Sequence, residues 1–129
     1  GRSGVNPTAA AVDLLWRRES LAEEVSDAAR DYIATMQTPE GGLAASQGAP
    51  CADLLSTFTG AVALGRTGIP EGLKLAPLGK YVKKLAAWRG GFRGAAPDTE
   101  TDVEYTWYGV GLAGLLSGQA ARMHAEKDG

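Results

Sequence analysis

Several residue types that build common functional sites are scarce in this 129-residue chain. It contains one cysteine, Cys51, and one histidine, His124. A lone cysteine excludes an internal disulfide and favours a reducing compartment, so we expect a cytoplasmic protein. The sequence also offers no His/Cys metal cluster, no Ser-His-Asp set and no glycine loop of the kind that cradles phosphate groups.

An excess of positive charge and long apolar runs are absent as well. Thirteen Lys and Arg residues stand against 15 Asp and Glu, for a formal net charge of −2. No basic excess is available to neutralise phosphate backbones, so we expect no nucleic-acid partner. The uninterrupted apolar runs are far shorter than the roughly 20 residues of a membrane span, so we expect no transmembrane segment.

Glycine, by contrast, is abundant, with 18 residues, and separates stretches of helical periodicity. Ser20 and Glu23 have the spacing of a capping box, which predicts a helix from there to about Gln37. About five main helices are expected in all, at residues 8–17, 20–37, 51–65, around 78–88 and 102–116. The predicted fold class is therefore all-α.

The chain also repeats itself with a period of 49 residues. Without gaps, the pairs in register include Tyr32/Tyr81, Gly41/Gly90, Asp53/Asp102, Thr57/Thr106, Phe58/Trp107, Gly60/Gly109 and Gly65/Gly114. Nearly uncharged stretches alternate with amphipathic ones, which predicts inner helices alternating with outer helices. A period of this length with two helices per unit is typical of stacked helical hairpins, so residues 1–129 are expected to form a single repeat domain.

The repeat unit resembles a known family. Tyr32-Ile33, followed by Gln37 and then Gly41-Gly42-Leu43, is similar to the repeat of protein prenyltransferase β subunits and of squalene and other terpene cyclases. The second copy keeps Tyr81-Val82 and Gly90-Gly91-Phe92 but has Ala86 in place of the glutamine. The resemblance implies helical hairpin repeats that form part of an α/α toroid around an apolar cavity.

Two functions follow from the resemblance. The first is a prenyltransferase-like transferase or terpene-cyclase-like domain whose inner helices hold an isoprenoid substrate. The alternative is a non-catalytic toroid-type scaffold that binds an apolar ligand or a protein partner. About two and a half units are too few to close a ring, so we expect a C-terminal segment of a longer protein. Self-association through exposed apolar inner helices is also expected.

Four acidic residues are the catalytic candidates: Asp98, Glu100, Asp102 and Glu104. Prenyltransferases of this family hold zinc with an Asp-x-Cys pattern, and Glu104 stands where that cysteine would be, so the resemblance implies no zinc site. Asp102 could instead cap its helix. The acidic run could bind magnesium with a diphosphate. It could also hold an acid of raised pKa that protonates an alkene, or form a solvated loop at a helix N-terminus.

The substrate-binding candidates are mainly aromatic: Tyr105, Trp107, Tyr108 and Phe58, together with Asp53, the repeat counterpart of Asp102. Aromatic faces can line a cavity and stabilise carbocations as they do other cations. Aromatic residues at helical spacing can equally be core residues. Cys51 lies near the start of an expected inner helix, where either a reactive thiolate or a structural cysteine is possible.

Overall fold

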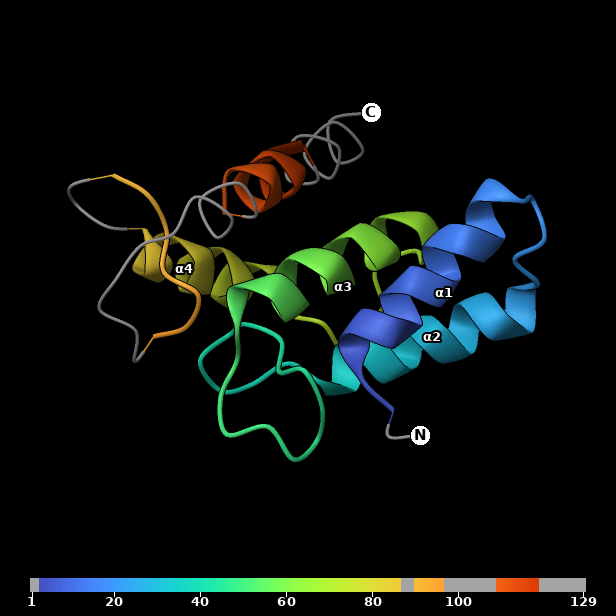
Figure 1. The fold of residues 1–129 in the computed structure, drawn as a ribbon, viewed down its shortest axis with the longest axis horizontal. Coiled ribbons are helices and arrows are strands. Elements are labelled where there is room, and N and C mark those ends of the chain that lie inside the picture. Colours follow the sequence, from blue (N-terminus) through green and yellow to red (C-terminus); the bar gives the residue numbers. More distant parts are fainter. Residues whose placement is uncertain (1–2, 87–89, 97–108, 119–129) are drawn as a thin grey trace.

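The regular structure of the chain is α-helical throughout the described residues. The computed structural model describes residues 3–86, 90–96 and 109–118. The helices are α1 (Val5–Arg17), α2 (Glu23–Thr35), α3 (Leu54–Thr67) and α4 (Leu75–Leu85), and residues 109–118 are also helical (Figure 1). The prediction of an all-α chain with about five helices is confirmed. Outside the helices, the described loops pair only through isolated bridges.

The start of α2 differs from its prediction. The backbone N–H and the hydroxyl group of Ser20 both donate to the carbonyl oxygen of Leu15, at 2.9 and 3.4 Å, so Ser20 completes the turn after α1. The N-cap of α2 is Ala22, which has no side-chain cap. The capping-box interpretation was therefore wrong. Glu23 and Glu24 instead place negative charge in the first turn, where the helix dipole favours it.

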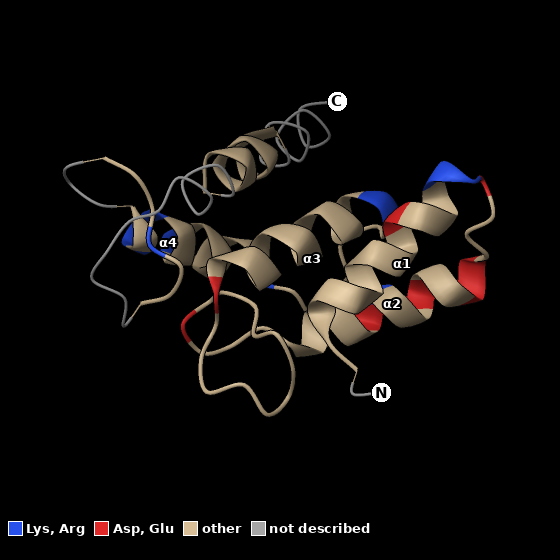
Figure 2. Cartoon of the chain, in the orientation of Figure 1, with Lys and Arg blue, Asp and Glu red and all other residues tan. Residues whose placement is uncertain are grey.

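The core lies where α3 packs against α1 and α2. Its buried residues come from α1–α4 and from two connecting segments: Ala9, Val12, Ala29, Ile33, Leu43, Ala63, Leu64, Leu73 and Leu78. Charged side chains lie mainly on α2, at helix ends and on α4, while the middle of α3 is uncharged (Figure 2). This distribution explains why α3 is buried on several sides.

A second cluster lies at the other end of α3. Side chains of Leu54, Tyr81 and Leu112 bring α3, α4 and the 109–118 helix together, and Ala52, Val82 and Leu85 complete this cluster. In Figure 1 the 109–118 helix lies on the far side of α3 from α2. The second cluster therefore packs the 109–118 helix against α3 and α4.

The turn after α2 fits against α4 only because it contains two adjacent glycines. Gly41 has a φ of +101°, and a Cβ atom there would lie 2.2 Å from the carbonyl oxygen of Pro77. A Cβ atom on Gly42 would lie 2.4 Å from the Tyr81 ring. Gln37 fixes the same turn, since its side-chain amide donates to the carbonyls of Gly41 and Lys74 and its Oε1 accepts from Lys74 N. The Gly-Gly pair and Gln37 thus join the end of α2 to the start of α4.

Candidate functional site

The best candidate for a ligand site in the described residues is an apolar pocket. It lies between the C-terminal half of α3, the 68–75 connection, α4 and the 109–118 helix. Its lining consists of nine apolar side chains and one glycine: Leu43, Ala61, Leu64, Gly65, Ile69, Leu73, Leu75, Leu78, Leu115 and Leu116. Gly65 and Leu115 are exposed, so the pocket is open to solvent beside them.

The pocket exists because the gap between α3 and the 109–118 helix is filled differently from the gap between α1 and α3. Between α1 and α3, the guanidinium carbon of Arg66 lies 3.9 Å from the centroid of the Trp16 ring. One period later, Gly65 occupies the register of Trp16, and Leu115 occupies that of Arg66. A Cβ atom on Gly65 would meet no heavy atom within 4 Å. The missing indole ring therefore leaves apolar space between α3 and the 109–118 helix.

The size of the pocket limits what it can hold. Its volume is about 50 Å³. A dry engineered cavity of about 150 Å³ can bind benzene, and sites for whole drug-sized ligands have volumes of about 300–1,000 Å³. Because the pocket has apolar walls and an open side, it can receive the methyl-bearing end of an apolar chain. The rest of such a ligand would lie outside it.

Two of the substrate-binding candidates, Asp53 and Phe58, lie at the N-terminal end of α3. Asp53 is the N-cap: its Oδ1 accepts from the backbone N–H of Ser56 at 2.7 Å, and its Oδ2 accepts from the Ser56 hydroxyl at 2.8 Å. Phe58 is half-buried and packs against the second cluster, beside Gly111. Asp53 therefore has a capping role, and Phe58 belongs to the packing around the second cluster. Neither residue lines the apolar pocket.

The remaining candidates lie outside the described residues. These are Asp98, Glu100, Asp102, Glu104, Tyr105, Trp107 and Tyr108. Within residues 3–86, 90–96 and 109–118, no group of three or more His, Cys, Asp or Glu side chains could hold a metal ion. Cys51 is a free, half-buried thiol.

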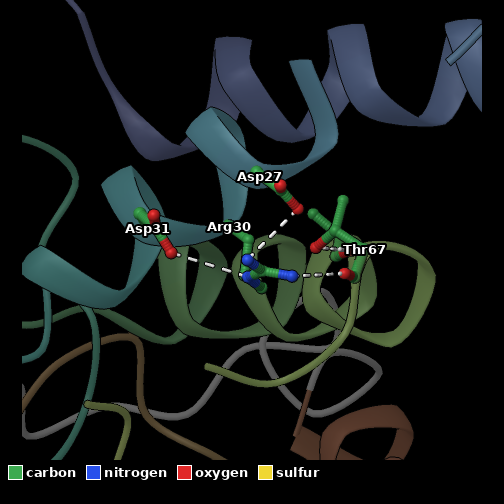
Figure 3. Close-up of polar contacts among 5 residues, drawn as sticks. Asp27, Arg30, Asp31 and Thr67 are labelled. Carbon is green, nitrogen blue, oxygen red and sulfur yellow. Dashed lines mark hydrogen bonds and ion pairs between the residues drawn. The ribbon is translucent and has the colours of Figure 1, made fainter. Parts of the chain in front are cut away.

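A polar cleft lies beside the turn between α1 and α2, but the arginine that extends from α2 beside it is not free to bind an anion. Arg30 extends from α2 towards the end of α3, where its Nη1 donates to the carbonyl oxygen of Thr67 at 3.5 Å (Figure 3). Its Nη2 lies 3.1 Å from Asp27 Oδ1, and its Nε lies 3.5 Å from Asp31 Oδ1. The guanidinium charge is thus already paired, and Arg30 serves to join α2 to the C-terminal end of α3.

A cluster of charged side chains surrounds Asp13 on α1. Arg17 Nε donates to its Oδ2 at 2.7 Å, and Arg66 Nη2 lies 2.7 Å from its Oδ1. The hydrogen bond from Arg17, aided by the positive charges of both arginines, lowers the pKa of Asp13 below its usual value of 3.8. This cluster joins α1 to α3 through charge, although Arg66 Nε has no hydrogen-bond partner.

Comparison with models of known protein families gave no match, and comparison with curated proteins gave none either. No helix in the described part of the chain combines the length and apolar character that crossing a membrane requires. The features that bear on function are therefore the pocket and the helices around it.

Sequence reasoning did not identify the apolar pocket, although a signal for it was present. Gly65 was aligned with Gly114, but it also aligns with Trp16 one period upstream. A large aromatic residue replaced by glycine in the same register indicates a gap between neighbouring helices. The leucines that line the gap come from separate elements, so only the structure shows that they share it.

Proposed function

We propose that this chain binds the apolar end of an isoprenoid-type chain in the pocket beside Gly65. The observation that carries the proposal is the lining: every side chain around the pocket is apolar, and the open side faces solvent at Gly65 and Leu115. An alkyl or prenyl chain end is the ligand chemistry that gains from such walls. A diphosphate or other polar head group would lie outside the pocket.

The proposal includes the arrangement of the helices as hairpin repeats that form part of an α/α toroid. Equivalent hydrogen bonds 49 residues apart support it. Val5 N donates to Ala45 O at 2.9 Å, and Leu54 N donates to Gly94 O at 2.7 Å. The bridge between Gln37 and Leu43 has its counterpart in the bridge between Ala86 and Phe92. A Cβ on Gly60 would meet Leu43, and a Cβ on Gly109 would meet Phe92.

A prenyltransferase-like or terpene-cyclase-like reaction would require the acidic candidates Asp98, Glu100, Asp102 and Glu104 near the ligand. Their participation stays a prediction, and magnesium would be their preferred metal. The second candidate function is a non-catalytic scaffold that binds an apolar ligand or a protein. The capping bonds of Asp53 favour it, because they give this carboxylate a structural role in α3.

Equilibrium binding to the purified chain tests the proposal. We would titrate farnesyl diphosphate, farnesol and inorganic diphosphate by calorimetry. Farnesyl diphosphate and farnesol should both bind with a negative heat-capacity change, because apolar surface is buried, and inorganic diphosphate alone should not bind. Binding of inorganic diphosphate alone, or no binding by either farnesyl compound, would contradict the proposed site.

A pair of variants locates the site. Gly65→Leu places a side chain in the pocket, whereas Gly79→Leu adds the same side chain at a helical glycine of α4 that also has no heavy atom within 4 Å of its Cβ position. Excluding about two methylene groups, at about 0.8 kcal/mol each, should weaken binding roughly tenfold in Gly65→Leu. Gly79→Leu should bind like the unchanged chain. Equal binding by both variants would place the ligand elsewhere.

A further inference from the structure

One face of α1 is uncovered in the described part of the chain. The exposed residues of this face follow helical spacing: Pro7, Ala10, Ala11 and Leu14. One period later the same positions on α3 are Ser56, Thr59, Gly60 and Ala63. Those residues face α1, since the Thr59 hydroxyl donates to Asn6 Oδ1 at 2.6 Å and a Cβ on Gly60 would lie 3.2 Å from Val5. Leu14 is 53% exposed, whereas its counterpart Ala63 is 2% exposed.

The 109–118 helix also carries an exposed face. Val110 is 61% exposed, and Ala113 and Gly114, one turn further along the same side of the helix, are exposed as well. Two periods upstream, Val12 takes the position of Val110 on α1 and is only 2% exposed. Val12 is buried in the same cluster as Ala63 of α3. The position that α1 buries against α3 is thus exposed on the 109–118 helix, and no element in the described part of the chain buries Val110.

We propose that these two faces bind each other between copies of the chain, so that α1 of one copy packs on the 109–118 helix of the next. Val12 and Ala63 are buried in one cluster inside each copy, and Val110 and Leu14 hold the equivalent positions on the two exposed faces. The contact would therefore repeat the packing of α1 against α3, with Leu14 of one copy against Val110 of the next.

A second copy is the occupant that the two faces fit best, because one chain carries both halves of the contact. Residues 109–118 contain no charged side chain, and the exposed stripe of α1 is also uncharged (Figure 2). Such a contact joins unlike surfaces, so it builds a closed ring or an open chain of copies and leaves no twofold dimer as the end product. This association goes beyond the proposed function and needs no ligand.

Sedimentation equilibrium of the 129-residue chain over a wide concentration range tests the proposal. The mass of the unchanged chain should rise with concentration above that of one copy. Leu14→Asp and Val110→Asp should each remain monomeric, because each removes one of the two faces. Val25→Asp is the matched control: Val25 is an exposed apolar residue on α2, away from both faces, and this variant should associate like the unchanged chain.

Mixing the two monomeric variants separates this contact from any other. Leu14→Asp keeps an intact 109–118 face and Val110→Asp keeps an intact α1 face, so an equimolar mixture should form a dimer of one copy of each. Far-UV circular dichroism checks that all variants keep their helices, and Leu14→Gln with Val110→Gln replaces any variant that does not. An unchanged chain that stays monomeric at every concentration overturns the proposal. A mixture that fails to form dimers overturns it as well.

Discussion

The guanidinium group of Arg66 lies over the indole ring of Trp16, with its carbon 3.9 Å from the ring centroid. This contact closes the gap between α1 and α3 near their C-terminal ends. In the gap between α3 and the 109–118 helix, Gly65 and Leu115 take these positions and leave an apolar pocket of about 50 Å³. Residue differences at two positions, each compared with the position 49 residues upstream, thus distinguish a packed helix contact from a candidate ligand site.

The ion pairs around Asp13 predict a pH dependence of stability. The folded-state pKa of Asp13 is lowered, mainly by the hydrogen bond from Arg17, so its contribution is fully present above the usual value of 3.8. The contribution is lost as the pH falls through the lower folded-state pKa. Urea unfolding at several pH values from 7 to 2 should show a larger acid-induced loss for the unchanged chain than for Asp13→Asn. Equal losses would mean that Asp13 gains nothing from its arginines.

Gly60 should not tolerate a methyl group. Its Cβ would lie 2.4 Å from Leu43 Cδ1 and 3.3 Å from Ile33 Cγ2, between tightly packed helices. Gly60→Ala should therefore lower the free energy of unfolding by about 1–3 kcal/mol, as overpacking does in cores. Gly65→Ala in the same helix should raise it by up to about 1 kcal/mol, because its Cβ meets no atom within 4 Å and alanine favours helix. Chemical denaturation measures both values, and the same sign for both variants would contradict this packing.

Gln37 should stabilise the junction between α2 and α4 through its three hydrogen bonds to Gly41 and Lys74. Gln37→Ala removes all three, and we expect a loss of about 1–3 kcal/mol in the free energy of unfolding. Gln47→Ala, an exposed loop substitution, is the control and should change it by less than about 0.5 kcal/mol. A loss in Gln37→Ala no larger than in the control would show that the amide bonds exchange freely with water.

The helices could be predicted from the sequence because their apolar periodicity is strong, but their starting residues could not. Asn6 is of a residue type that favours helix caps, yet α1 begins at Val5 after Gly4. The Asn6 side chain instead bonds to Thr59 of α3. The Ser20 hydroxyl group likewise donates to the carbonyl oxygen of Leu15. In both cases a tertiary or neighbouring partner competed with the local cap, and residue spacing carries no information about that partner.

The candidate site was less predictable than the fold. Phe58 and Asp53 were selected as substrate-binding residues by type and register, and they lie in core packing and in a helix cap. The pocket depends on two features: the absence of a side chain at Gly65, and the positions of the leucines on α4 and the 109–118 helix. The register of the repeat could show the first of these. The second depends on the distances between helices, which a single sequence does not contain.

The most direct test of the pocket as an apolar-chain site is a methyl NMR titration of the leucine-labelled chain with farnesol. We expect saturable shifts of the Leu64, Leu73, Leu78 and Leu115 methyl resonances, with little change at Leu14 on the far side of α1. The same shifts should disappear in Gly65→Leu and persist in Gly79→Leu. Unshifted pocket methyls at saturating farnesol, or identical shifts in the two variants, would contradict the proposed site.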